Sequence, residues 1–358
     1  MRRAHFAAFQ PICLGCLAEG RGASLLEIGE VVRGDADEVI EGALVCPAVP
    51  CRREFPILDG IPFLVPDVRE VVSKQIGEIR GREDLSPFAE SLLGDCLGPG
   101  SDLDRARHYL SCYASGHWSD LDPEAPAPAA LTPVLDAAFG LVGTPRGRWL
   151  DVGCSVGRGT FELAARTGAL TLGVDLSFSM LRLARRIARE GRLRYPRRKL
   201  GLVYERREHA VAAPGAADVD FWMVDATALP FADAAVDGAL SLNLLDCVSW
   251  PLSHLLELGR VLRDDGQAVI ATPYDWSAGA TAVEGWLGGH SQRASHGGSS
   301  VAELHRLLAP TGRPAGAPPL ALVGERDDVP WRVRVHERGT MHYRLHMMHV
   351  RVATDVTR

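Results

Sequence analysis

The chain has 358 residues, of which 46% are hydrophobic, and it carries a formal net charge of -6 at pH 7. This length and apolar content suffice to bury the cores of two domains. The negative charge argues against a surface built for nonspecific nucleic-acid binding. The charged N-terminus is untypical of a signal peptide and no apolar run reaches membrane-spanning length, so we expect a cytoplasmic protein without membrane contact or disulfides.

Four of the eight cysteines form two pairs near the N-terminus. Two residues separate Cys13 from Cys16, and four separate Cys46 from Cys51. Two such pairs on tight turns, with a hairpin-sized segment between them, provide the thiolates of a tetrahedral zinc site. We therefore predict a structural zinc ion on these four cysteines, with His5 as a reserve ligand. The scattered cysteines are predicted to be packing residues: Cys96, Cys112, Cys154 and Cys247.

The run from Phe55 to Pro66 follows the second cysteine pair and is rich in proline and apolar residues. Together with the cysteines it resembles the small zinc-ribbon proteins that act as activator subunits of RNA and protein methyltransferases. The resemblance covers residues 1–66 and implies a zinc-ribbon domain fused ahead of an enzyme. Because such a ribbon has a small core, its folding is expected to depend on its metal.

Residues 67–145 are predicted to form a mainly helical connector that ends in a Pro/Ala-rich linker at 122–133. Within the connector, residues 107–118 are dense in aromatic and polar side chains. We expect either a lid that closes over a cofactor or a helix packed through its aromatic residues. The substrate-binding candidates in this segment are Tyr109, Tyr113 and His117.

An apolar run at 149–150 ends in the acidic residue Asp151 and is followed by a turn of small residues and then by a helical pattern. This order is typical of a cofactor-binding strand-turn-helix unit. Gly153, Ser155 and Gly157 fall at every second position, which departs from the fingerprint of dinucleotide-binding proteins.

Further apolar strands at 170–174, 221–226, 236–243 and 267–272 alternate with helical patterns, and residues 331–352 alternate as a final antiparallel hairpin. Strands that alternate with helices predict an α/β fold with a parallel sheet covered on both faces.

Five motifs in this order resemble those of class I S-adenosylmethionine (SAM)-dependent methyltransferases: Asp151 to Gly157, Gly173 to Ser177, Asp225 to Phe231, Val236-Asp237 and Gly259 to Gly266. The resemblance covers about residues 146–274. It departs at Ser155, where the family more often has glycine, and at Asp264-Asp265, where Lys-Pro is commoner. It implies a Rossmann-like, seven-stranded methyltransferase domain over residues 146–358.

The resemblance also implies which residues bind SAM. Asp151 and the turn after it would approach the methionine part, Asp175 would accept the ribose hydroxyls, and Asp225 would bond the adenine amino group. Leu176 would cover the adenine ring, and Asn243 would lie beside the sulfonium. The full implied set is Asp151, Gly153, Ser155, Gly157, Asp175, Leu176, Asp225, Ala226 and Asn243. The alternative role for each aspartate is a helix N-cap.

The segment after the fifth strand is expected to contact the acceptor, with Trp276 and Arg293 as candidates. If the acceptor atom carries a proton that must be removed, the candidate bases are Asp246, Tyr274 and His290. In the last hairpin, His342 and His346 share a strand face, where either a second metal or ordinary surface histidines are conceivable.

Three functions remain open. We favour methyl transfer to a small-molecule or peptide acceptor. The segment after the fourth strand lacks the Asn/Asp-Pro-Pro-Tyr motif, which counts against amino methylation of adenine or of glutamine side chains. The alternative is an RNA methyltransferase, since ribosomal-RNA guanine-N1 methyltransferases also place a zinc ribbon before this fold. An Arg-rich stretch at 182–207, expected to be a helix followed by a loop, is either an RNA contact or a solvated face. A SAM-binding scaffold without turnover is the third function, and the oligomeric state is open.

Overall fold

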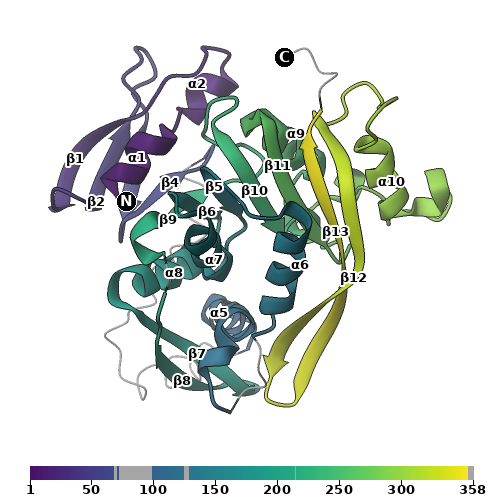
Figure 1. Ribbon diagram of the computed structural model, residues 1–358. Helices are drawn as coiled ribbons and strands as arrows, with labels where there is room; N and C mark the ends of the chain where they lie inside the picture. The colour runs from purple at the N-terminus through teal and green to yellow at the C-terminus, as the bar shows by residue number, and fades with distance from the viewer. Residues whose placement is uncertain (68–70, 72–98, 125–128, 214, 354–358) are drawn as a thin grey trace.

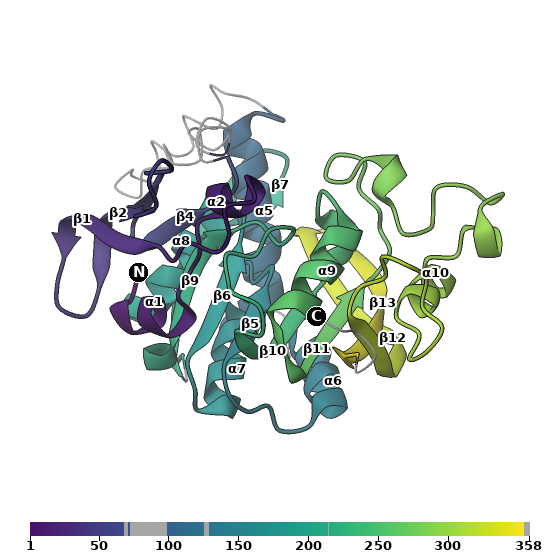
Figure 2. The same cartoon turned by 90° about the horizontal axis from the view of Figure 1, so that it is seen from above.

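The computed structural model describes residues 1–67, 71, 99–124, 129–213 and 215–353. Its centre is one eleven-stranded sheet in the order β1-β2-β3-β4-β9-β6-β5-β10-β11-β13-β12. Helices flank this sheet on both faces, as Figures 1 and 2 show. Among the described helices, none is long and apolar enough to cross a membrane. Cys96 and most of residues 68–98 lie outside the described residues.

Seven of the strands form the expected methyltransferase sheet. They are β9 (Val219–Val224), β6 (Thr171–Asp175), β5 (Trp149–Val152), β10 (Val236–Leu242), β11 (Leu262–Thr272), β13 (Gly339–Val352) and β12 (Leu320–His336). The first five run parallel, and β13 is antiparallel to both β11 and β12. The Rossmann-like α/β prediction and the final antiparallel hairpin are thereby confirmed.

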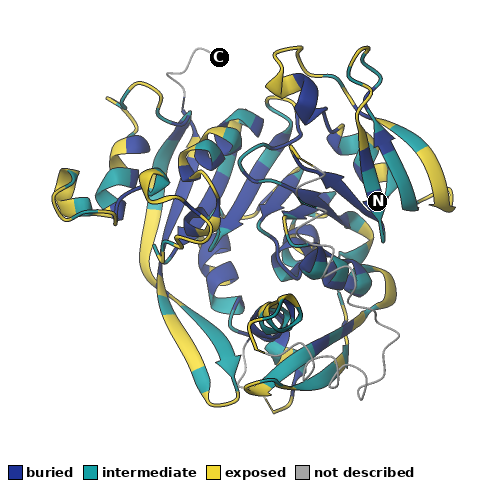
Figure 3. Cartoon of the chain, turned by 180° about the vertical axis from the view of Figure 1, so that it is seen from behind, coloured by how far each residue is buried: buried dark blue, intermediate teal, exposed yellow. Residues whose placement is uncertain are grey.

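The two faces of this sheet are covered by different helices. One face packs against α5 (Asp102–Trp118), α6 (Thr132–Val142), α7 (Arg158–Thr167) and α8 (Phe178–Glu190). The other packs against α9 (Pro251–Val261), α10 (Ser300–Leu307) and α1 (Arg3–Phe9). Along β9, Phe221 and Met223 point to the first face, whereas Trp222 and Val224 point to the second. A strand covered on both faces reads as a continuous apolar run, which is why the sequence shows it so clearly. Figure 3 shows these central strands buried.

Short 3-10 helices connect several of the elements: η1 (Ser119–Leu121), η2 (Ala216–Asp218), η3 (Leu245–Cys247), η4 (Val283–Gly285) and η5 (Ser295–Gly298). The described part of the connector consists of α5, η1, α6 and the loops between them.

The N-terminal segment continues the methyltransferase sheet. It contains α1, α2 (Leu14–Ala18), β1 (Glu27–Gly34), β2 (Val39–Val45), β3 (Glu54–Leu58) and β4 (Ile61–Leu64). Strand β4 pairs in parallel with β9, with Phe63 opposite Met223 and Leu64 opposite Val224. Phe9 of α1 also packs edge-on against Trp222, with the ring centroids 6.1 Å apart. The domain boundary at residue 66 stays a prediction from sequence, because the hydrogen-bonded sheet runs across the two units.

The expected loop after the Arg-rich helix is wrong. Residues after α8 form a two-stranded antiparallel hairpin, β7 (Arg192–Leu200) and β8 (Val203–Ala210). Leu193 and Tyr195 are buried on one side of β7, so alternation of apolar residues stabilises a strand here. Pro196 hid this strand in the sequence, because a proline argues against a central strand. It is tolerated in β7 because a two-stranded hairpin has no central strand.

Arg185 ties the N-terminal segment to the methyltransferase core. Its side chain is only 2% exposed and forms ion pairs with Glu38 of the β1–β2 turn and with Asp220, whose Oδ1 lies 3.4 Å from the guanidinium. Asp220 is fully buried, whereas Glu38 is 16% exposed. The nearby guanidinium helps to hold the pKa of the Asp220 carboxyl at about 2 despite its burial.

Replacement of Arg185 by alanine should lower the free energy of unfolding by roughly 3–5 kcal/mol, because the Asp220 carboxylate would be left buried without its cation. Urea denaturation followed by tryptophan fluorescence measures this change. Arg189, which is 42% exposed and 3.6 Å from Glu38, is the matched control. Equal small effects of both alanine variants would contradict the structural role of Arg185.

Candidate active site

The implied SAM-binding residues gather at the carboxyl ends of four adjacent strands. Gly153 follows β5, Asp175 ends β6, Asp225 follows β9 and Asn243 follows β10. The strand order β9-β6-β5-β10 places these ends side by side. In open parallel sheets, ligands bind at this edge.

The turn after β5 has the backbone geometry of a close approach. Gly153 has a φ of 77°, and a Cβ atom there would lie 2.9 Å from Leu244 Cδ1, so only glycine fits. Ser155 has a φ of 51°, and its amide donates a 2.9 Å hydrogen bond to Asp175 Oδ2. A serine in this conformation costs about 1–2 kcal/mol relative to glycine. The departure from the family pattern is therefore accommodated without moving the turn.

Asp175 and Asp225 each bond the backbone that follows their strand. Asp175 Oδ1 accepts the Ser177 amide at 2.8 Å, at the start of α8, and Asp225 Oδ1 accepts the Thr227 amide at 2.8 Å. Burial raises the pKa of Asp175. Neither aspartate is a helix N-cap, because Ser177 holds that position in α8 and a turn follows Asp225. Each carboxylate instead stabilises the turn after its strand, and with about four lone-pair sites it can accept ligand hydroxyls as well. The SAM contacts of both aspartates stay predictions, as does the cover of the adenine ring by Leu176, which is 42% exposed.

Two buried oxygen atoms at the end of β10 have no hydrogen-bond partner among the described residues: Asn243 Oδ1 and Asp246 Oδ1. The other oxygen of Asp246 accepts the Asp275 amide at 2.7 Å, and burial raises the pKa of Asp246. Buried polar atoms are nearly always satisfied in folded proteins. These two atoms therefore suit a bound molecule that brings hydrogen-bond donors or positive charge, as SAM and a hydroxyl acceptor do.

A buried histidine, which was not among the residues predicted from the sequence, stabilises the backbone near these strand ends. His254 of α9 lies 2.8 Å from Ser241 Oγ and 3.1 Å from the carbonyl oxygen of Ala226. Its burial lowers the pKa to about 4, so the ring is neutral. It fixes the backbone at Ala226, the residue expected to meet the adenine ring. In the sequence, His254 has the spacing of a core residue of α9, so nothing there distinguishes it.

Asp151, next to the turn, has a strongly raised pKa. Burial, with a smaller effect of the Asp175 charge, raises its pKa to about 7, and Thr160 Oγ1 donates to it at 2.8 Å. Without a bound cation the carboxyl thus holds its proton up to near-neutral pH. The ammonium group of SAM would favour the ionised form.

SAM affinity should therefore rise with pH as Asp151 loses its proton. Below a pKa of about 7 the protein must release this proton to bind the cation, so affinity should increase by up to about tenfold per unit between about pH 5.5 and about pH 7, then level off. Calorimetry in buffers of different ionisation enthalpy measures both affinity and proton release. The Asp151→Asn variant should bind with a flatter profile, and an equally steep profile in that variant would contradict the assignment.

Helix α5 covers the turn, as the lid alternative requires. Trp118 Nε1 donates to the Val156 carbonyl oxygen at 3.2 Å, and the Trp118 ring packs edge-on against Phe161. Burial raises the pKa of the Tyr113 hydroxyl, and the neighbouring Cys247 and Asp175 raise it further, which places this tyrosine beside the site.

The three substrate candidates of α5 lie on one helix face. The Tyr109 and Tyr113 rings stack at 6.4 Å, and Tyr113 meets His117 edge-on at 6.4 Å. Burial lowers the pKa of His117 to about 3, whereas Tyr109 is 55% exposed. The helix is thus both packed through its aromatics and placed over the site, and contact with substrate stays a prediction.

The acceptor-side candidates separate into two groups. Tyr274 and Trp276 follow β11 close to the site, and Trp276 stacks on Trp286 while donating to Ser300 Oγ at 3.0 Å. His290 and Arg293 are exposed on the loop before α10. Asp246 and Tyr274 are therefore brought to the end of the sheet, while His290 and Arg293 stay predictions on an outlying loop.

The four N-terminal cysteines converge as expected. Their sulfur atoms lie within 4.8 Å of one another, with Cys13 Sγ 3.7 Å from Cys51 Sγ and Cys16 Sγ 3.6 Å from Cys46 Sγ. A tetrahedron with Zn–S bonds of about 2.3 Å has edges of roughly 3.8 Å, so the donor set and its spacing fit zinc. His5 is absent from this described group, and its Nε2 lies 3.0 Å from the Asp218 carbonyl oxygen instead.

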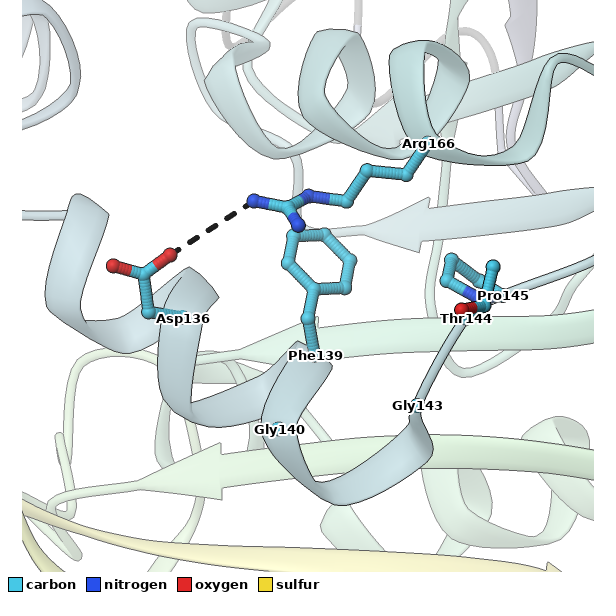
Figure 4. A pocket seen from close by; sticks show the side chains of 7 residues that line it. All are labelled: Asp136, Phe139, Gly140, Gly143, Thr144, Pro145 and Arg166. Atoms are coloured by element: carbon cyan, nitrogen blue, oxygen red, sulfur yellow. Dashed lines mark ion pairs between the residues drawn. The ribbon is translucent and has the colours of Figure 1, made fainter.

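Two further pockets lie elsewhere. A pocket of about 380 Å³ is next to the segment that leads into the amino end of β5 (Figure 4). There the Arg166 guanidinium lies 4.1 Å from the centre of the Phe139 ring and 3.8 Å from Asp136, so its charge already has a partner. A second pocket, of about 490 Å³, opens between α5, β7 and the β12–β13 hairpin.

Comparison with known proteins agrees with the geometry. The "Methyltransferase domain" family model matches residues 150–270. The curated protein "Methyltransferase GfsG" of Streptomyces halstedii is 29% identical over 50% of this chain and 56% of its own length. "O-methyltransferase cnsE" of Penicillium expansum is 30% identical over 34% of this chain and 36% of its own length. The chain thus spans about half or less of these relatives.

Among solved structures, a SAM-dependent methyltransferase of Methanosarcina mazei is similar at 18% identity, with a TM-score of 0.39, over 58% of this chain and 93% of that one. The strand order, the residues at the strand ends and the matched family model agree on one conclusion. The chain contains a class I SAM-dependent methyltransferase domain.

Proposed function

We propose that the protein transfers the methyl group of SAM to a hydroxyl group of a small-molecule or peptide acceptor. The observation that carries the proposal is the pair of unsatisfied buried oxygens on Asn243 and Asp246, next to the strand ends expected to hold SAM. The name of one relative, an O-methyltransferase, supports a hydroxyl acceptor.

SAM, when bound, supplies a methyl group on a sulfonium that is already reactive. The chain's own residues then act mainly by positioning and by excluding water. The turn from Gly153 to Gly157 and Asp175 would hold the cofactor, and α5 with Trp118 covers this turn from solvent.

Asp246 is the base that we favour for a hydroxyl acceptor. Burial raises its pKa, and its Oδ1 is available to accept a proton while the Asp275 amide holds Oδ2. A base with a raised pKa is better suited to remove a proton near neutral pH than an ordinary aspartate.

The RNA alternative is weakened by how the Arg-rich stretch is paired. Arg197 lies 2.7 Å from Asp122 Oδ2, Arg192 lies 3.4 Å from Glu208 and Arg186 lies 3.7 Å from Glu190. Cations neutralised within the chain contribute less to phosphate binding than free ones. This pairing favours the solvated-face interpretation over an RNA-binding surface.

The test is incubation of the purified protein with methyl-labelled SAM and cell extract separated into RNA, protein and small-molecule pools. Label in the small-molecule or protein pool is expected, and the Asp246→Asn variant should lose most of this transfer while binding SAM normally. Label in RNA alone would replace this proposal by the RNA alternative. SAM binding without label in any pool would favour the scaffold.

A further inference from the structure

Three side chains of metal-ligating types, from three separate elements, converge at the edge of the sheet formed by β13 and β12. They are His305 of α10, Glu325 of β12 and His346 of β13. Glu325 pairs across the ladder with Met348, so it lies diagonal to His346 on the same face, within reach of a long side chain. Helix α10 brings His305 to this face.

The donor atoms of the three side chains lie within 4.8 Å of one another. Glu325 Oε2 lies 2.7 Å from His305 Nε2 and 2.9 Å from His346 Nε2. The two imidazole rings are 5.9 Å apart and nearly perpendicular, at 83°. Two imidazoles and one carboxylate are the donor set of zinc sites with an open position and of two-histidine, one-carboxylate iron sites.

The surroundings of the cluster also fit a metal. The His305 and Glu325 side chains are 42% and 41% exposed, so water can reach the remaining coordination positions, whereas His346 is 6% exposed and held in place. The other ring nitrogen of His346, Nδ1, is hydrogen-bonded to the hydroxyl of Tyr274. A metal-bound histidine usually has such a partner on its second nitrogen, which fixes the ring orientation.

We propose that His305, Glu325 and His346 bind a divalent transition-metal ion with the ligand preference of zinc, at a site separate from the four cysteines. The partner of His346 differs from the sequence expectation. His342 stands four residues away on the same strand, about 13 Å along it, which is too far for both histidines to hold one ion. Through His346 and Tyr274 the ion would stiffen the end of β11 beside the proposed acceptor site.

The competing account is a cluster without metal, in which both imidazoles donate to the Glu325 carboxylate. The two accounts differ in metal uptake, so the test uses the full chain prepared without metal and titrated with Co²⁺. We expect two equivalents to bind. The four-cysteine equivalent gives a strong sulfur-to-cobalt charge-transfer band, and the second equivalent adds visible absorption without that band.

The variants His305→Ala and Glu325→Gln change half-exposed side chains and should leave the fold intact. Each should abolish the second equivalent or weaken its affinity at least about tenfold. Loss of an outer-shell partner alone typically costs about 10–100-fold in metal affinity, and loss of a direct ligand should cost no less. His342→Ala is the matched control and should keep both equivalents.

Uptake of only the charge-transfer equivalent by the unchanged chain would overturn the proposal. A second equivalent that binds both ligand variants with unchanged affinity would also overturn it. Because the measurement is metal binding, its result is independent of the proposed methyl transfer.

Discussion

Loss of the zinc ion that Cys13, Cys16, Cys46 and Cys51 are predicted to hold should unfold the N-terminal segment. Structural zinc in comparable small folds contributes on the order of 10 kcal/mol. Limited proteolysis after chelation should therefore cut within residues 1–66 before it cuts the methyltransferase core. Equal resistance with and without the chelator would contradict the prediction.

A pair of cysteine variants separates the effect of zinc from that of a lost thiol. Cys46→Ser removes one of the four converging sulfurs and should become protease-sensitive without chelator. Cys247→Ser, at an exposed cysteine outside the cluster, should behave as the unchanged chain does. Because β4 pairs with β9 directly before Asp225, loss of the segment should also weaken SAM binding.

The Asp175→Ala variant should lose SAM affinity by at least about 100-fold. Two hydrogen bonds from ribose hydroxyls to a carboxylate contribute roughly 1.5–3 kcal/mol each. The variant also frees the amides of Ser155 and Ser177, which Asp175 now fixes. Titration calorimetry with SAM measures the loss.

Two further variants make the Asp175 result specific. Asp175→Asn keeps one acceptor oxygen without the charge and should bind with intermediate affinity. Asp136→Ala removes an exposed aspartate in the pocket of Figure 4, away from the strand ends, and should bind SAM normally. Undiminished affinity in Asp175→Ala would mean that this residue only stabilises the backbone around the strand ends.

The sequence predicted well where local pattern and function coincide. Parallel strands buried on both faces appear as apolar runs, and the small residues between Gly153 and Gly157 mark the turn after β5. The convergence of the four cysteines followed from their spacing, because a metal site requires a fixed set of donors.

What the sequence could not predict depends on contacts between distant segments. The ion pair between Arg185 and Asp220 joins a helix to a strand. In the sequence, each of the two looks like an ordinary charged residue. His305, Glu325 and His346 meet only because α10 folds back onto the last hairpin. The pairing of β4 with β9 was equally hidden, since the sequence of a four-residue strand does not specify its partner.

That pairing changes which strand ends the sheet. Strand β9 would be the open edge of a seven-stranded methyltransferase, but here the outermost position on this side belongs to β1. β1 carries Glu27, Glu30 and Arg33, and its pairing with β2 is broken by register shifts. Charged side chains and an irregular backbone discourage a strand from another molecule from joining. The N-terminal segment thereby protects an apolar strand from self-association, a benefit to solubility that is separate from any role in catalysis.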